Sequence, residues 1–145
     1  MKIVFWITFI LAVSCVTSTQ VLKGKNSDEI LNHLQSNNYN IYILYFVDPK
    51  AGDNKTKEAN QDIESKLGGV LSENQEIFYS KIDYTSADFS KLSSVVGVTE
   101  TPAVLLIVHG KGVWVSGRNS DLMTERIRDF LPAFKQASAH HSNPY

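Results

Sequence analysis

The chain has 145 residues, of which 43% are hydrophobic and 20% charged, and its formal net charge is −1. This length supports one domain with a sizeable core, and the composition is that of a globular protein rather than a disordered one. The chain is nearly neutral and its lysines are scattered along the sequence, so it lacks the basic surface of a nucleic-acid-binding protein. We therefore expect no nucleic-acid partner.

The first 19 residues have the features of a targeting segment. Lys2 precedes an uncharged apolar run over residues 3–16, and small or polar residues follow. This pattern is typical of a secretory signal peptide cut after Ser18, which would place the protein in the endoplasmic reticulum lumen or outside the cell. The alternative is an uncleaved membrane anchor, because the uncharged stretch 3–22 approaches the ~20 residues that span a bilayer. That alternative favours an organelle membrane such as the mitochondrial inner membrane.

Cysteine usage limits the chemistry in either case. Cys15 is the only cysteine of the chain and lies inside the apolar run. Cleavage of the leader would leave a protein with no disulfide and no thiolate nucleophile.

Strands and helices alternate along residues 20–135, which we predict to form one domain. After a short strand at 21–22, Ser27 and the two acids that follow it are typical of the N-cap and first turn of a helix, which ends by residues 37–38. The nearly all-apolar segment 41–47 predicts a strand covered on both faces. Further strands are predicted at 77–83, 103–108 and 113–116, and further helices at 55–66, at 88–96 and from residue 120 onward.

Glycine and proline suggest where several elements end. Gly68-Gly69 is expected to stop the second helix, and the two glycines within residues 109–112 predict a hairpin turn. Ser120-Asp121 is expected to cap the last helix, and Pro132 should kink it or end its regular part. The polar residues 136–145 are then predicted to form a flexible tail.

The predicted order β-α-β-α-β-α-β-β-α indicates an α/β fold with a mostly parallel sheet and an antiparallel hairpin at one edge. Over about residues 20–135 the chain resembles a thioredoxin-like domain. The resemblance rests on the apolar strand that runs into a loop and helix over residues 41–54, on Gly97-Val98 and Pro102 before the strand at 103–108, and on the Gly-x-Gly hairpin beyond it. It implies a three-layer α/β/α sandwich with a mixed central sheet.

The resemblance also implies a partner-binding region. In thioredoxin-like proteins the proline that enters this strand is cis, faces the active-site loop, and lies beside backbone that pairs with an extended peptide. Here that bond would be Thr101-Pro102. The alternative interpretation is that Pro102 only shapes the entry to the strand.

The same resemblance indicates that the usual chemistry is missing. Ala51, Gly52, Asp53 and Asn54 occupy the positions of the Cys-x-x-Cys motif, and Tyr45 stands where many redox-active members have a buried acid. Disulfide exchange needs one thiolate to attack and a second thiol to resolve the mixed disulfide. The sequence therefore predicts a redox-inactive protein.

Asn54-Lys55-Thr56 is an N-glycosylation sequon at the start of the predicted second helix. In a lumenal protein, a glycan on Asn54 would crowd the face that redox-active members use for substrates. The alternative role for Asn54 is to cap the helix.

No residue pattern indicates a catalytic, cofactor or metal site. Asp48, Asp53, Glu58 and Asp62 lack the dense spacing of a calcium loop, and His140-His141 has no fixed partners in a tail. An enzyme that works at some other site would need a pocket of converging polar groups, which nothing in the sequence predicts. We therefore expect no cofactor, no metal and no enzymatic activity.

Two functional hypotheses remain. The first is a redox-inactive binding or assembly module, with a protein partner held at Asp48, Ala51, Gly52, Asp53, Asn54, Thr101 and Pro102. The second is a membrane-anchored accessory subunit of a larger membrane protein complex.

Overall fold

The computed structural model describes residues 20–140. The predicted leader, residues 1–19, and the last five residues of the predicted tail lie outside the described residues. Within residues 20–140, none of the helices is both long and apolar enough to cross a membrane. The elements are β1 (Gln20–Val21), α2 (Ser27–Ser36), β2 (Tyr42–Val47), α3 (Asn54–Glu73), β3 (Phe78–Asp83), the 3₁₀ turn η3 (Ala87–Phe89), α4 (Ser90–Val96), β4 (Ala103–Val108), β5 (Lys111–Ser116) and α5 (Ser120–His140).

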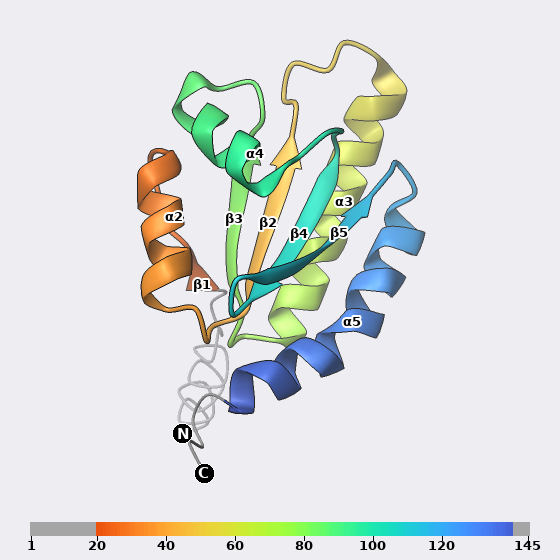
Figure 1. The fold of residues 1–145 in the computed structure, drawn as a ribbon. Helices are drawn as coiled ribbons and strands as arrows, with labels where there is room; N and C mark the ends of the chain where they lie inside the picture. Colours follow the sequence, from red (N-terminus) through yellow and green to blue (C-terminus); the bar gives the residue numbers. More distant parts are fainter. Residues whose placement is uncertain (1–19, 141–145) are drawn as a thin grey trace, which may run out of the picture.

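The strands form one mixed sheet in the order β1-β3-β2-β4-β5. β1, β3 and β2 run parallel, whereas β4 is antiparallel to β2 and β5 is antiparallel to β4. Helices α2 and α4 cover one face of the sheet, and α3 and α5 cover the other, as Figure 1 shows. The predicted three-layer α/β/α sandwich with an antiparallel hairpin at one edge is confirmed.

The core has two halves because β2 is buried on both faces. Ile43, Tyr45 and Val47 pack toward α3 and α5, while Tyr42, Leu44 and Phe46 alternate with them and pack toward α2 and α4. This alternation is the period of two that a strand imposes on its side chains. It explains why the whole segment is apolar, since both of its faces are covered.

Helix α3 is longer than predicted. Gly68-Gly69 does not stop it, and the helix continues to Glu73. Val70 and Leu71 lie beyond the glycines and are buried on the face that also carries Ile63 and Leu67. A mid-helix glycine costs about 1 kcal/mol relative to alanine, whereas burying each of these side chains gains about 1.5–3 kcal/mol. The packing therefore outweighs the weak local propensity.

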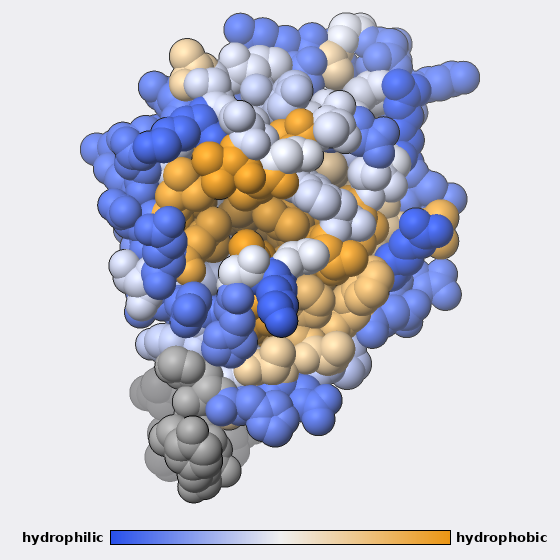
Figure 2. Space-filling model, viewed as in Figure 1, coloured by the Kyte–Doolittle hydropathy of each residue, from blue (hydrophilic) through white to orange (hydrophobic). Residues whose placement is uncertain are grey.

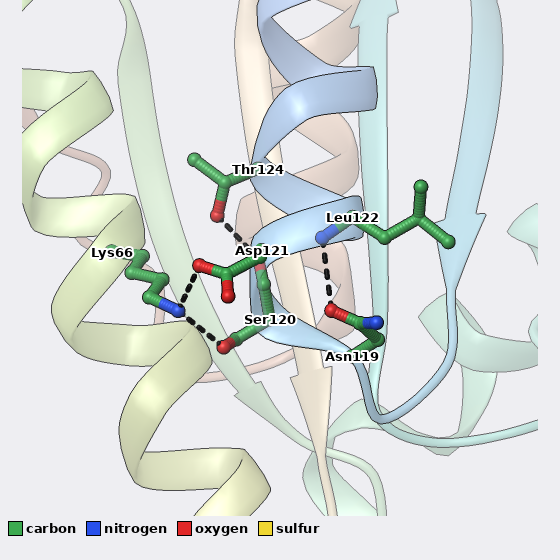
Figure 3. Close-up of polar contacts among 6 residues, drawn as sticks. All are labelled: Lys66, Asn119, Ser120, Asp121, Leu122 and Thr124. Carbon is green, nitrogen blue, oxygen red and sulfur yellow. Dashed lines mark hydrogen bonds and ion pairs between the residues drawn. The ribbon is translucent and has the colours of Figure 1, made fainter.

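The N-caps are not the residues that the sequence indicated. Asn26 rather than Ser27 caps α2, and Asn119 rather than Ser120-Asp121 caps α5 through a 3.0 Å bond from the Leu122 backbone N–H to its Oδ1. The two serines are buried and serve tertiary contacts instead. The Ser27 hydroxyl joins α2 to the segment before and within α4, and Ser120 Oγ accepts a 2.7 Å bond from Lys66 Nζ of α3 (Figure 3).

The last helix also corrects the predicted tail. α5 continues through Pro132 to His140, so the first five residues of the predicted tail, 136–140, are helical. Leu131 is buried, and Phe134 and Ala137 pack against the core. The Ser138 hydroxyl donates a 2.6 Å bond to the Tyr39 carbonyl. These contacts hold the final turns against the sheet. They compensate for the backbone hydrogen bond that is lost at Pro132, so the helix continues beyond it.

The hairpin turn is shorter than the sequence suggested. β5 begins at Lys111, which leaves only His109 and Gly110 as the turn, and both have positive φ values of 52° and 71°. Two residues in this conformation are typical of a type I′ turn, which matches the twist of the strands it joins.

Candidate functional site

The predicted site segments meet at one end of the sheet. The loop of residues 48–53 follows the end of β2, and Thr101-Pro102 immediately precedes β4. β2 and β4 are antiparallel neighbours, with Phe46 opposite Ala103. The Thr101-Pro102 peptide bond is cis, as the resemblance implied.

The loop before α3 is ordered by its own aspartates. Asp48 Oδ1 accepts a 2.9 Å bond from the Lys50 backbone N–H, and the Asp48 carbonyl accepts a 3.3 Å bond from the Ala51 N–H. Asp48 and Ala51 are half-buried, whereas Gly52 and the residues on to Lys55 are exposed. The loop therefore presents Gly52 to solvent on a fixed backbone.

Asp53 is the N-cap of α3. Its Oδ2 accepts bonds from the Thr56 backbone N–H at 3.0 Å and from the Thr56 hydroxyl at 2.8 Å. The hydroxyl bond is the main cause that lowers the pKa of Asp53, and the charge of Arg118 adds a smaller effect in the same direction. Asp53 is thus held as an anion at the positive end of the helix.

Asn54 does not cap the helix, because Asp53 fills that role. Asn54 is the first residue of α3 and its side chain is exposed. Thr56, the third residue of the sequon, is buried with its hydroxyl on Asp53. The asparagine amide that would carry a glycan therefore faces solvent beside the loop.

The opposite side of the site is formed by the segment around the cis bond. Pro102 is buried, and its carbonyl accepts a 3.3 Å bond from the Gly117 N–H. Within residues 20–140, neither the N–H nor the carbonyl of Thr101 makes a backbone hydrogen bond. Thr101 is half-buried, so its main chain is available beside the loop.

Three residues that sequence reasoning did not identify also lie at this end of the sheet. Arg118 lies near enough to Asp53 to influence it, and the Ser116 hydroxyl donates to the Glu100 carboxylate. Next to them is a small cavity of about 160 Å³ lined by Val98, Thr99, Glu100, Ala103, Trp114 and Ser116. No motif marks these residues in the sequence, because the fold alone brings the loop after β5 to the start of β4.

The thiols of disulfide exchange are missing from the described site. Residues 20–140 contain no cysteine. Tyr45 is fully buried, and its hydroxyl donates a 3.2 Å bond to the Asn60 carbonyl. Burial raises the pKa of Tyr45 well above its usual value, so the phenol stays protonated. No group of three or more His, Cys, Asp or Glu side chains in this part of the chain is arranged to hold a metal ion.

Comparison with known proteins places the fold. Neither protein-family models nor curated proteins give a match. Among solved structures, thioredoxin from Fasciola hepatica is 20% identical over 77% of this chain and 98% of its own, with a TM-score of 0.58. Thioredoxin O1 from Arabidopsis thaliana in its oxidised state is 15% identical (77% and 97% covered; TM-score 0.61). Thioredoxin f2 from Chlamydomonas reinhardtii is 14% identical (79% and 98% covered; TM-score 0.61).

Proposed function

We propose that the chain is a redox-inactive binding or assembly module that holds an extended segment of a protein partner beside Thr101-Pro102. Its thioredoxin-like fold spans almost the whole length of the thioredoxins compared above. The observation that carries the proposal is a retained cis-proline segment with free Thr101 backbone groups, facing a loop from which both thiols are absent. Without a thiolate the site offers binding but no disulfide exchange.

The proposed binding mode is strand addition. The free N–H and carbonyl of Thr101 supply main-chain hydrogen bonds to an extended segment, which give affinity without reading its sequence. The cavity between Val98 and Trp114 accepts one small side chain of that segment. The exposed loop around Gly52 forms the opposite wall, so the shape of the loop limits which partners fit.

Substitution of Gly52 tests this proposal. A Cβ at Gly52 meets nothing within 4 Å and its φ is not positive, so Gly52→Arg should leave the fold intact while an arginine side chain crowds the site. We expect loss of most of the bound partner in quantitative affinity capture from cells that express the full chain, by about tenfold or more. Thermal unfolding should be unchanged.

The matched control is Gly68→Arg. Gly68 is also exposed with open space around its Cβ position, but it lies within α3, far along the helix from the loop. This variant adds the same side chain and charge and should retain the partner. If Gly52→Arg captured as much partner as Gly68→Arg, the loop would be ruled out as the binding surface.

The compartment is the second part of the proposal: the secretory pathway, with the leader removed and Asn54 glycosylated. The exposed side chain of Asn54 supports it. Protein from its native source should have an intact mass that shows the leader has been removed, and glycosidase treatment should lower that mass further. Asn54→Gln should abolish the decrease on glycosidase treatment. A full-length mass without glycan would instead favour the anchored subunit of a membrane complex, which the uncharged stretch at 3–22 also allows.

A further inference from the structure

The cavity beside Thr101 has one charged side chain in its wall. It has a volume of about 160 Å³ and lies on the face of the sheet that α2 and α4 cover, where the segment before the cis bond meets β5. Among the residues that line it, only Glu100 is charged. Glu100 is exposed, and the Ser116 hydroxyl donates to its carboxylate. A partner segment at Thr101 would therefore meet a negative charge that is held at the rim of the cavity.

The charge of Glu100 is not neutralised by the rest of residues 20–140. The ion pairs in this part of the chain join lysine and arginine side chains to other acids. Arg118 lies at the same end of the sheet, and its charge acts on Asp53. Because the carboxylate has no cation of its own within these residues, charge complementarity favours a basic side chain as its partner.

The other walls of the cavity suit an apolar stem. Val98 and Ala103 are aliphatic, and Trp114 adds an aromatic ring that contacts Phe46 with ring centroids 5.6 Å apart. Trp114 also lines an apolar groove of about 430 Å³. Figure 2 shows that the apolar surface of this groove, between α2, α4 and the β4–β5 hairpin, gives way to more polar side chains toward the start of β4. The cavity thus lies where apolar surface meets polar surface.

We propose that this cavity binds a lysine side chain of the partner's extended segment, an inference that rests on the function proposed above. Lysine lays its methylene stem along apolar surface and keeps its ammonium group in water, which matches apolar walls with an exposed carboxylate at the rim. The face of Trp114 adds an electrostatic attraction for the same cation. Arginine fits less well, because its planar guanidinium is wider than a compact ammonium and the cavity is small.

Peptide selection tests this inference separately from the proposed function. The probe is a library of random short peptides displayed on phage, and the target is the full chain purified from eukaryotic cells. We expect the selected peptides to share a lysine at one position and to lose binding to Gly52→Arg. Peptides that lose binding to Gly52→Arg but share no lysine would overturn this inference and leave the proposed function standing. Selected peptides that bind Gly52→Arg as well as wild type, or no selected peptide at all, would overturn both.

A double substitution then tests whether the lysine meets Glu100. In a synthetic copy of a selected peptide, norleucine in place of lysine keeps most of the stem and removes the charge. By fluorescence anisotropy, this change should raise the dissociation constant about tenfold with wild type, through the lost ion pair and cation–π contact. With Glu100→Gln, which keeps an acceptor for the Ser116 hydroxyl, the same change should cost only about threefold, the part that Trp114 supplies.

The matched control is Glu125→Gln. Glu125 is an exposed acid of α5, so the variant makes the same charge change away from the cavity and should keep the full effect of about tenfold. Thermal unfolding of both variants should match wild type, since both side chains are exposed. An effect of norleucine that is as large with Glu100→Gln as with Glu125→Gln would place the lysine elsewhere and overturn the inference.

Discussion

Replacing Tyr45 by aspartate is expected to remove most of the stability of the fold at neutral pH. Tyr45 is fully buried in the middle of β2, and its only polar contact is with the Asn60 carbonyl, which cannot stabilise an anion. Loss of the large side chain costs about 3–5 kcal/mol. Burial of the new carboxylate raises its pKa by three units or more, which adds about 4 kcal/mol at pH 7. The sum approaches the whole stability of a typical domain, about 5–15 kcal/mol.

The sign of the pH dependence separates the charge effect from the size effect. An aspartate whose pKa is raised in the folded state destabilises the fold increasingly as pH rises above its unfolded pKa of about 3.9. Tyr45→Asn has nearly the same shape without the charge and serves as the control. We expect the Asp and Asn variants to converge near pH 4 and to separate by pH 7 in urea unfolding. Equal stability of the two variants at pH 7 would show that this position can hold an ionised acid.

This result bears directly on the proposed function. Tyr45 supplies a buried, hydrogen-bonded phenol where the resemblance implies a buried acid in redox-active thioredoxin-like proteins. Two cysteines placed in the loop would still have no ionisable acid beside them. Tyr45 stays protonated because the surrounding core favours a neutral side chain. The absence of thiols and the presence of Tyr45 therefore support the same proposal from separate parts of the site.

The sequence predicted the strands and their order well because their signals are local. The unbroken apolar run at 41–47 indicated a strand covered on both faces. Gly97 was predicted to end the helix before it, and it is the C-cap of α4 with a positive φ of 77°. The cis bond at Thr101-Pro102 came from the resemblance rather than from any propensity. The strand and the helix end each depend on a few adjacent residues, whereas the cis bond does not.

The errors arose where distant residues decide the outcome. Nothing near Gly68-Gly69 reveals that Val70 and Leu71 have a core to pack against, and nothing near residue 136 reveals that Tyr39 accepts a hydrogen bond from Ser138. Ser27 and Ser120 matched the cap pattern, but their hydroxyls serve contacts with elements far away in the sequence. The same reason hid Glu100, Ser116 and Arg118 from the predicted site.

Removal of the Phe46 side chain is expected to weaken the core and to loosen Trp114, which lines the cavity of the proposed site. Phe46 is fully buried, lies opposite Ala103 next to the cis bond, and contacts Trp114 with ring centroids 5.6 Å apart. Phe46→Ala should lower the free energy of unfolding by about 3–5 kcal/mol, through lost burial and the cavity left behind. Because Trp114 loses its aromatic neighbour, its fluorescence should shift to longer wavelength in the native state.

Phe130→Ala is the matched control, since Phe130 of α5 is 37% exposed. The same deletion there should cost less than half as much, because water already contacts the ring and no closed cavity forms. Urea unfolding of the two variants, followed by circular dichroism, gives both free energies on one scale. If Phe46→Ala cost no more than Phe130→Ala, β2 would not be packed against α2, α4 and β5 as described. Trp114, which lines the cavity of the proposed site, would then lack the aromatic contact that holds its ring in place.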